Sequence, residues 1–185
     1  RTFRVEAGHT ILLHAAAGGV GLIASQWAKR LGATVIGTVG SPEKAELARA
    51  HGCDHTILYR EENFVERVKA ITDGKGVDVV YDAVGKDTFL PSLDCLRPMG
   101  MMVNFGNASG PAAPLDLLLL SQKGSLYVTR PTIMTYTAKR EDLVASAIEL
   151  FNMVGSGAVR IAVNQTYPLA DAAPAHRDLT ARQTT

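Results

Sequence analysis

His14-Ala15-Ala16-Ala17-Gly18-Gly19-Val20-Gly21 is the stretch of sequence that decides the fold. A β-rich apolar run precedes it and a segment of helical period follows it, which is the setting that a dinucleotide-binding turn requires. Gly18 and Gly19 carry no side chain, so the backbone can approach a pyrophosphate, and the N–H groups and positive dipole of the next helix would face the anion. Gly21 allows that helix to pack tightly on the preceding strand. We therefore predict a phosphate-binding turn here.

One position departs from the usual dinucleotide pattern. The first glycine of G-x-G-x-x-G is replaced by Ala16. The alternative is an ordinary glycine-rich turn between a strand and a helix, because a lone glycine motif is a weak signal. The repeated strand-helix units around the motif favour the nucleotide site.

Short β-rich runs alternate with longer segments of helical period along the whole chain. Such repeats predict parallel strands joined by right-handed crossovers, so the expected fold is α/β, a doubly wound parallel sheet (Rossmann fold) of about six strands. An extra helix-strand-helix is expected at the C-terminus. The predicted strands are Thr10–Ala16, Thr34–Val39, His55–Tyr59, Val77–Val84, Met101–Gly106, Ser125–Arg130 and Val159–Val163. The predicted helices are Val20–Leu31, Pro42–His51, Asn63–Thr72, Asp87–Leu96, Leu115–Gln122, Arg140–Val154 and Ala170–Ala181.

The composition excludes several classes of partner. The chain has 185 residues and a formal net charge of +1, so no charge imbalance indicates nucleic acid or a membrane surface. The longest purely apolar run, Leu117–Leu120, is far shorter than the roughly 20 residues that span a bilayer. Cys53 and Cys95 are isolated, which predicts neither a disulfide framework nor a zinc cluster and favours a cytoplasmic location.

The end of the second predicted strand indicates which nucleotide binds. An NAD-preferring site places an acidic residue there for the ribose 2′-hydroxyl, but this strand ends in Val39 and continues with Gly40 and Ser41. A hydroxyl, free N–H groups and the ammonium of Lys44 suit a 2′-phosphate, so we predict NADP(H). We expect Glu43 to point along its helix and away from the ribose. The alternative for Lys44 is an ordinary solvated lysine.

Tyr59 ends the third predicted strand, next to Arg60. At the carboxyl edge of the sheet its ring could flank an adenine, and its hydroxyl could reach the 2′-phosphate. A tyrosine that only caps the core at a strand end is the alternative.

Five segments closely resemble NADPH:quinone oxidoreductases of the zeta-crystallin-like group, which belongs to the medium-chain dehydrogenase/reductase superfamily. The resemblance covers essentially the whole chain, and the bacterial members are the most similar. The segments are His14–Gly21, Leu22–Lys29, Tyr59–Glu62, Val80–Gly85 and Gln122–Pro131.

The resemblance implies an activity and a cofactor site. Members of the group reduce quinones with NADPH and use no zinc. By this resemblance the pyrophosphate is expected at Gly18, Gly19 and Val20, with Gly21 behind them, and the 2′-phosphate at Gly40, Ser41, Lys44 and Tyr59. The rest of the cofactor is expected along Val84, Phe105, Gly106, Asn107 and Arg182.

Members of the group also carry a GroES-like domain before this region and a short closing strand after it. We therefore expect residues 1–185 to be the NADP-binding domain of a longer enzyme, with the quinone bound in a cleft between two domains. The sequence indicates no metal ligand and no catalytic residue, because the cofactor carries the hydride chemistry. His14 is predicted to be a hydrogen-bonded core histidine, and Asp82 to bond local backbone.

The sixth predicted strand would form an edge of the sheet. Members of the group form homodimers through this strand, so the resemblance implies pairing through Ser125–Val128. The alternative is an edge covered by the helix Arg140–Val154.

Three other functions stay open. An enoyl reductase of the same superfamily would have nearly the same cofactor half. A nucleotide-binding domain without its own catalysis would bind NADPH and turn nothing over. A methyltransferase also uses a glycine-rich turn, but it usually has an acidic residue at the end of its second strand, which this sequence lacks.

Overall fold

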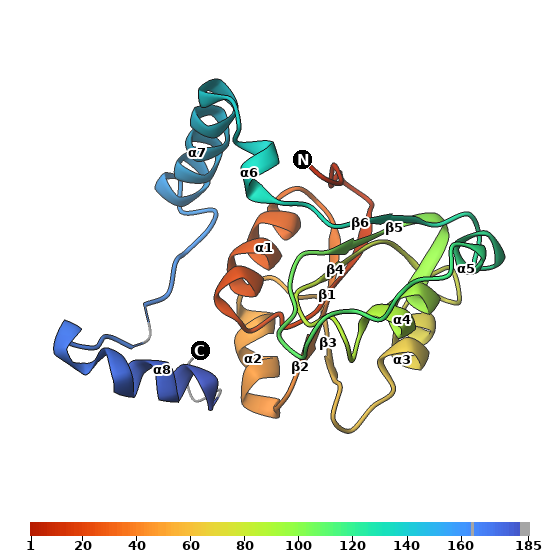
Figure 1. The fold of residues 1–185 in the computed structure, drawn as a ribbon, viewed down its shortest axis with the longest axis horizontal. Coiled ribbons are helices and arrows are strands. Elements are labelled where there is room, and N and C mark those ends of the chain that lie inside the picture. Colours follow the sequence, from red (N-terminus) through yellow and green to blue (C-terminus); the bar gives the residue numbers. More distant parts are fainter. Residues whose placement is uncertain (164, 182–185) are drawn as a thin grey trace.

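The protein folds around one six-stranded parallel sheet in the order β3-β2-β1-β4-β5-β6. A computed structural model describes residues 1–163 and 165–181 (Figure 1). The strand order reverses between β1 and β4, so the predicted doubly wound fold is confirmed. The strands are β1 (Thr10–Leu13), β2 (Thr34–Val39), β3 (His55–Leu58), β4 (Val77–Asp82), β5 (Leu96–Asn104) and β6 (Tyr127–Thr129).

Helices cover both faces of the sheet. Because side chains alternate along a strand, Ile11 and Leu13 of β1 join one core and Leu12 joins the other. Helices α1 (Gly19–Arg30) and α2 (Pro42–Ala50) pack on the first face, and α3 (Phe64–Ile71), α4 (Phe89–Ser92) and the 3-10 turn η1 (Leu93–Cys95) pack on the second. The remaining helices are α5 (Leu118–Gln122), α6 (Ile133–Tyr136), α7 (Arg140–Gly155), η2 (Leu169–Asp171) and α8 (Ala172–Thr180).

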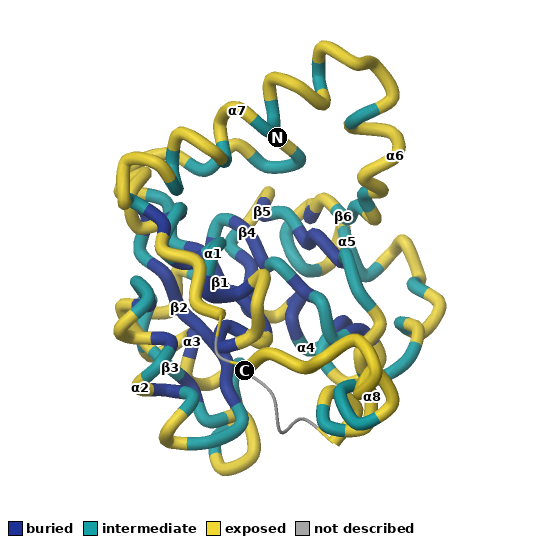
Figure 2. Tube along the Cα trace, turned by 90° about the vertical axis from the view of Figure 1, so that its left-hand side faces the viewer, coloured by how far each residue is buried: buried dark blue, intermediate teal, exposed yellow. Residues whose placement is uncertain are grey.

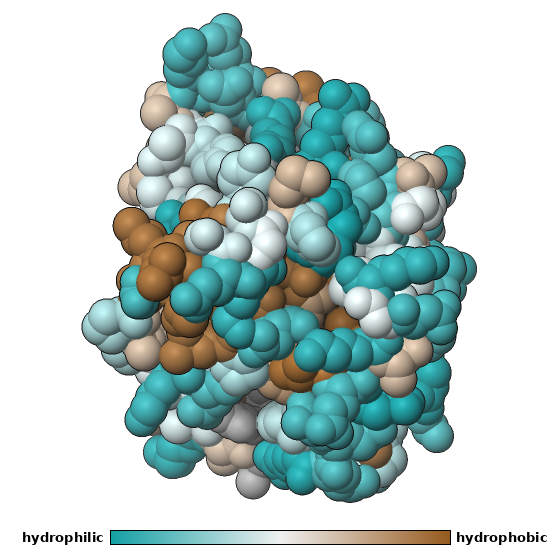
Figure 3. All heavy atoms as spheres, turned by 90° about the vertical axis from the view of Figure 1, so that its right-hand side faces the viewer, coloured by the Kyte–Doolittle hydropathy of each residue, from teal (hydrophilic) through white to brown (hydrophobic). Residues whose placement is uncertain are grey.

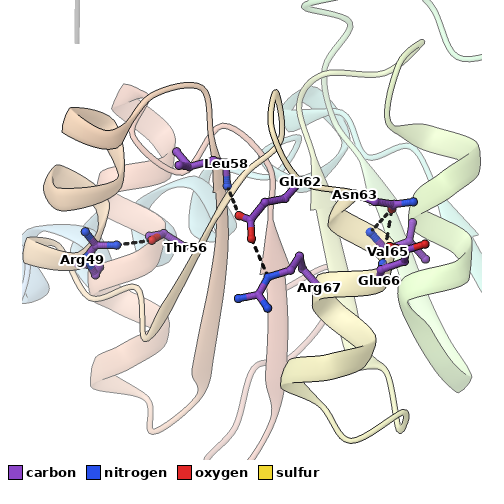
Figure 4. A network of polar contacts seen from close by, with 8 residues as sticks. All are labelled: Arg49, Thr56, Leu58, Glu62, Asn63, Val65, Glu66 and Arg67. Carbon is purple, nitrogen blue, oxygen red and sulfur yellow. Dashed lines mark hydrogen bonds and ion pairs between the residues drawn. The ribbon is translucent and has the colours of Figure 1, made fainter.

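Local hydrogen bonds fix the turn after β3 (Figure 4). The Glu62 carboxylate accepts from the N–H of Leu58 at 3.0 Å and pairs with Arg67 at 2.8 Å. The Asn63 side chain caps α3 by accepting from the N–H of Val65 at 3.0 Å. The chain between β3 and α3 is therefore a defined turn, and it begins at Tyr59.

The predicted strand Val159–Val163 is wrong, since the structure has no strand there. The edges of the sheet lie elsewhere, and the segment instead runs beside α1. Gln26 donates to the carbonyl of Arg160 at 3.0 Å and accepts from its N–H at 2.9 Å. Val159 is buried, with 1% of its surface exposed. A side-chain amide thus provides the hydrogen bonds that a neighbouring strand would have provided.

Other boundaries also differ from the prediction. Strand β5 starts at Leu96 and includes a residue with positive φ, Met99, whereas the helix before it is only the short pair α4 and η1. Strand β1 ends at Leu13 because the chain turns sharply at Ala15, which has a φ of 55°. Helix α5 is shorter than predicted, and α6 was not predicted at all.

The C-terminal third is much more exposed than the sheet (Figure 2). None of the residues of α7 or α8 is buried. Large apolar side chains such as Phe151, which is 67% exposed, and Leu169 face solvent there. This part of the chain therefore adds little to the core around the sheet.

Candidate functional site

Five loops gather the predicted site residues at one edge of the sheet. Each of these residues follows the carboxyl end of a strand, and parallel strands place all those ends on the same side. Gly18–Gly21 follow β1, Gly40–Lys44 follow β2, Tyr59 follows β3, Val84 follows β4, and Phe105–Asn107 follow β5. Arg182 lies outside the described residues.

The start of α1 leaves backbone N–H groups free for an anion. Gly18 is the N-cap residue, provides no side-chain hydrogen bond, and is exposed, as are Gly19 and Val20. The first turn has no acidic residue, whereas Lys29 and Arg30 lie in the last turn. The positive end of the helix dipole is therefore not neutralised within the helix. Such an end fits a phosphate group.

The glycines of this turn differ in what they allow. A Cβ atom on Gly21 would lie 2.5 Å from the carbonyl oxygens of both Ala15 and Ala16, so the helix can approach the turn only with glycine at this position. A Cβ atom on Gly19 would meet nothing within 4 Å. Gly21 therefore serves packing, and Gly19 faces open space where a ligand fits.

Ala16, the residue that breaks the usual glycine pattern, is accommodated by the neighbouring strand. It is buried, and Gly37 of β2 lies against it. A Cβ atom on Gly37 would lie 2.6 Å from the Cβ atom of Ala16 and 2.8 Å from the sulfur of Cys53. The missing side chain at Gly37 thus makes room for the Ala16 methyl group, which the sequence alone did not reveal.

The loop after β2 offers both a cation and an anion. Ser41 caps α2, and its hydroxyl accepts from the N–H of Lys44 at 3.4 Å. A hydrogen bond from Ser41 lowers the pKa of Glu43. Glu43 and Lys44 are neighbours in the first turn of α2, so a negative and a positive charge follow the Ser41 cap directly.

Tyr59 lies over Gly40. A Cβ atom on Gly40 would come within 3.0 Å of the Tyr59 hydroxyl oxygen, so glycine allows that ring to cross the end of β2. Tyr59 is 43% exposed. Its hydroxyl therefore lies at the same end of the site as the loop after β2 and stays accessible.

Asp82 forms the central hydrogen bonds at the carboxyl ends of β4 and β5. It is fully buried, and its Oδ1 atom accepts from the N–H of Val84 at 2.7 Å, the N–H of Gly85 at 3.2 Å and the hydroxyl of Thr88 at 2.8 Å. Its Oδ2 atom accepts from the amide of Asn104 at 3.1 Å. The expectation that Asp82 bonds local backbone is confirmed, and the bonds extend to β5.

His14 connects the half of the sheet edge formed by β1, β2 and β3 with the half formed by β4, β5 and β6. Its ring is 2% exposed and lies between the hydroxyls of Thr38 and Ser92, each 2.9 Å from a ring nitrogen. Ser92 donates its own proton to the carbonyl of Thr88 at 2.6 Å, so Nε2 of His14 is the donor toward Ser92 and Nδ1 accepts from Thr38. Burial lowers the pKa of His14 to about 4, against the opposing charge of Asp82. His14 is therefore the satisfied core histidine that the sequence predicted.

Arg130, directly after β6, was missed by the sequence prediction. Its Nη1 atom donates to the side chain of Asn104, to the carbonyl of Gly106 at 3.1 Å and to the side chain of Asn107 at 3.1 Å. The available signal was a charged residue at the carboxyl end of the sixth predicted strand, Ser125–Arg130. Arg130 thereby connects β6 with the loop after β5.

Two features are absent from the part of the chain that the structure describes. No cluster of three or more His, Cys, Asp and Glu side chains is arranged to hold a metal ion. No described helix is long and apolar enough to cross a membrane.

The strand order and the uncapped helix at its switch point define a Rossmann-type dinucleotide-binding domain. A family model described as zinc-binding dehydrogenase matches residues 19–153. The chain belongs to this family, and it is a cofactor-binding domain of the medium-chain dehydrogenase/reductase superfamily.

Individual relatives match this sequence over its whole length. A quinone oxidoreductase of Pseudomonas aeruginosa is 58% identical over 100% of this chain and 57% of its own length. A 2-haloacrylate reductase of a Burkholderia species is 50% identical over 100% of this chain and 56% of its own length. The crystal structure of Escherichia coli quinone oxidoreductase complexed with NADPH superposes with a TM-score of 0.96 at 52% identity, over 100% of this chain and 57% of that one. The chain thus spans little more than half the length of these relatives.

Proposed function

We propose that this chain is the NADPH-binding domain of an enzyme that reduces quinones with NADPH. The observation that carries the proposal is the pairing of two anion-binding features at one edge of the sheet. The free N–H groups at the start of α1 fit the pyrophosphate, and Ser41, Lys44 and Tyr59 fit a 2′-phosphate. The relatives named above support the choice of NADPH and quinone.

In this proposal the protein binds and orients, and NADPH when bound supplies the hydride. Gly18 and Gly19 let the backbone approach the pyrophosphate. The loops after β4 and β5, which include Val84, Phe105, Gly106 and Asn107, hold the nicotinamide half. We assign no catalytic residue and no metal to this chain, because in this proposal the cofactor carries the hydride chemistry.

The quinone would bind in a cleft completed by a second domain. We propose, following the family resemblance, that this domain is GroES-like and precedes the residues of this chain, and the 57% coverage of the Pseudomonas aeruginosa relative leaves room for it. Such a domain would also exclude water from the hydride transfer. Phe151 and Leu169 provide exposed apolar surface for packing against it.

Calorimetric titration of the full-length protein with NADPH and NADH tests the cofactor assignment. NADPH should bind well ahead of NADH, and its binding should weaken as salt is raised, because the extra affinity comes from charge. Equal affinity for both cofactors would contradict the 2′-phosphate site. Binding of NADPH without turnover of any quinone would leave a nucleotide-binding domain without catalysis.

An activated double bond is the second candidate substrate. The 2-haloacrylate reductase relative, at 50% identity, favours it. Assays of the full-length enzyme with benzoquinone and with 2-chloroacrylate, at equal NADPH, distinguish the two. We expect the larger kcat/KM for the quinone, and a larger value for the acrylate would overturn that choice.

We also propose a homodimer through the β6 edge. Strand β6 pairs only with β5 among the described residues, and Tyr127 is 58% exposed. Figure 3 shows apolar atoms gathered on the α5 side of the molecule, and Leu117 and Leu118 beside the edge are exposed. Two copies could therefore continue the sheet and bury these side chains.

Light scattering of Tyr127→Lys tests the dimer. A charge on the edge strand should shift the wild-type dimer toward monomer. Leu31→Lys, which adds the same charge at an exposed apolar position after α1, is the matched control and should stay dimeric. A monomeric wild type, or a Tyr127→Lys variant that stays dimeric, would contradict the proposal.

A cytoplasmic location is our last proposal here. Cys53 and Cys95 are both free and buried. Burial raises the pKa of Cys53 and raises the pKa of Cys95 to about 12, so neither thiol is activated for disulfide chemistry. This fits a reducing compartment. Fractionation of the source cells tests it, and recovery with extracytoplasmic proteins would contradict it.

A further inference from the structure

We infer that Arg130 is a positioning residue that holds the loop after β5 in place for the nicotinamide half of the cofactor. The inference rests on the proposed function. It concerns the residue directly after the edge strand β6, to which the sequence analysis gave no role and which makes no part of the phosphate-binding turn.

The loops after β4 and β5 form one unit. Backbone N–H groups of Ala108 and Ser109 donate to the carbonyls of Ala83 and Val84 at 3.1 and 2.9 Å. A Cβ atom on Gly106 would lie 2.4 Å from the carbonyl oxygen of Ala83, so the two loops touch along their backbones. A shift of one loop must therefore move the other.

Arg130 fastens this unit to β6. One guanidinium nitrogen reaches the Asn104 side chain, the Gly106 carbonyl and the Asn107 side chain. Asn104 in turn donates to Asp82, which binds the N–H groups at the start of the loop after β4. Arg130 therefore acts on both loops, on one directly and on the other through Asn104.

The partners of Arg130 are all neutral oxygen atoms. Among the described residues no carboxylate pairs with it, whereas six other side chains of Lys and Arg do form ion pairs. An arginine whose role was to strengthen the surface by an ion pair would face Asp or Glu. The Nη1 nitrogen of Arg130 instead reaches one oxygen at the end of β5 and two in the loop that follows, so its contacts hold the loop and do not neutralise a charge.

Arg97 provides a matched comparison at the opposite end of the sheet. It also lies in the outer part of the sheet, and it binds Asp78 at 2.7 Å and the carbonyl of Pro98 at 2.7 Å. These contacts lie near the amino ends of β4 and β5, away from the candidate site. Arg97→Met should therefore reduce stability without a selective effect on the nicotinamide end of the cofactor.

The test measures binding of NADPH and of 2′,5′-ADP, which lacks the nicotinamide, to the full-length protein. Arg130→Met should weaken NADPH binding about tenfold and leave 2′,5′-ADP binding unchanged. The fluorescence of bound NADPH should also change, because the reduced ring is held less firmly. Arg130→Lys should recover only part of the loss, and Arg97→Met should leave the ratio of the two affinities at its wild-type value.

Two results would overturn the inference. The first is wild-type NADPH affinity and fluorescence in Arg130→Met. The second is an equal loss of NADPH and 2′,5′-ADP affinity, which would indicate that the whole binding site is disturbed and not the nicotinamide end alone. A wild-type protein that binds neither ligand would instead overturn the proposed function, and the inference with it.

Discussion

Over β1, β2 and β3 the carboxyl edge of the sheet is made largely of backbone, whereas over β4, β5 and β6 it is made of side chains that bond to one another. The first half depends on glycines such as Gly19 and Gly21, which leave space or permit close approach. The second half depends on Asp82, Asn104 and Arg130, whose hydrogen bonds run from loop to loop. The difference teaches that, in the proposed site, one cofactor would be bound by two halves of a sheet edge that are built in different ways.

The strongest test of the first half is Gly21→Ala. Its methyl group would lie 2.5 Å from two carbonyl oxygens, so α1 must move away from the turn. We expect a loss of about 3 kcal/mol in the free energy of unfolding, measured with urea. The control is Gly19→Ala, where a Cβ atom meets nothing within 4 Å, and it should cost far less. Equal losses would show that packing against the turn is not what requires glycine.

The pH dependence of the free energy of unfolding tests the buried His14 contact between the two halves. The pKa of His14 is about 4 in the folded protein, below the ordinary value of 6.5. The unfolded chain therefore binds the extra proton first, and stability is full above pH 6.5 and falls as the pH is lowered toward 4. At pH 5 the loss should be about 2 kcal/mol.

Urea unfolding of the wild type and of His14→Gln at pH 7 and pH 5 measures this effect. The variant should be less stable at pH 7 but should lose less stability between the two pH values. The same pH dependence in both proteins would mean that another group titrates.

Lys44→Ala and Glu43→Gln test the phosphate end of the first half. Removing the ammonium group should weaken NADPH binding about tenfold and leave NADH almost unaffected. Removing the carboxylate of Glu43 should strengthen NADPH binding, because a negative charge next to Lys44 in the first turn of α2 is lost. Calorimetry at low salt shows both changes best. Changes of the same sign in the two variants would contradict this account.

The smallest expected effect is that of Tyr59→Phe. The ring can keep its place over Gly40, so only the hydroxyl is lost. We expect NADPH affinity to fall about threefold with no change in thermal stability, since the side chain is partly exposed. Tyr59→Ala separates ring from hydroxyl, and an unchanged affinity in that variant would restrict Tyr59 to capping the core.

The same contrast explains what the sequence could and could not predict. The doubly wound sheet and the turn at Gly18–Gly21 follow from local signals, because backbone sites need particular residues at fixed spacing. The second half depends on residues far apart in sequence. Arg130 and Asn104 are 26 positions apart, and no local pattern marks them as partners.

The wrong strand at Val159–Val163 has a similar origin. Its β-branched residues favour an extended chain, but a strand also needs a partner at a sheet edge. Here the side chain of Gln26, more than a hundred residues earlier in the chain, forms the hydrogen bonds that a partner strand would have formed. The segment is therefore not part of the sheet.

The contact of Ala16 with Gly37 has a consequence for evolution. Two strands share a space that holds one methyl group and the sulfur of Cys53, but no second methyl group. A side chain at position 37 is therefore permitted only if Ala16 first becomes glycine and the Cys53 sulfur gives way, whereas alanine at position 16 requires glycine at position 37. Homologous sequences should show alanine and glycine exchanging between these two sites as a correlated pair, and a lineage that acquired Ala16 must have passed through a protein that already had Gly37.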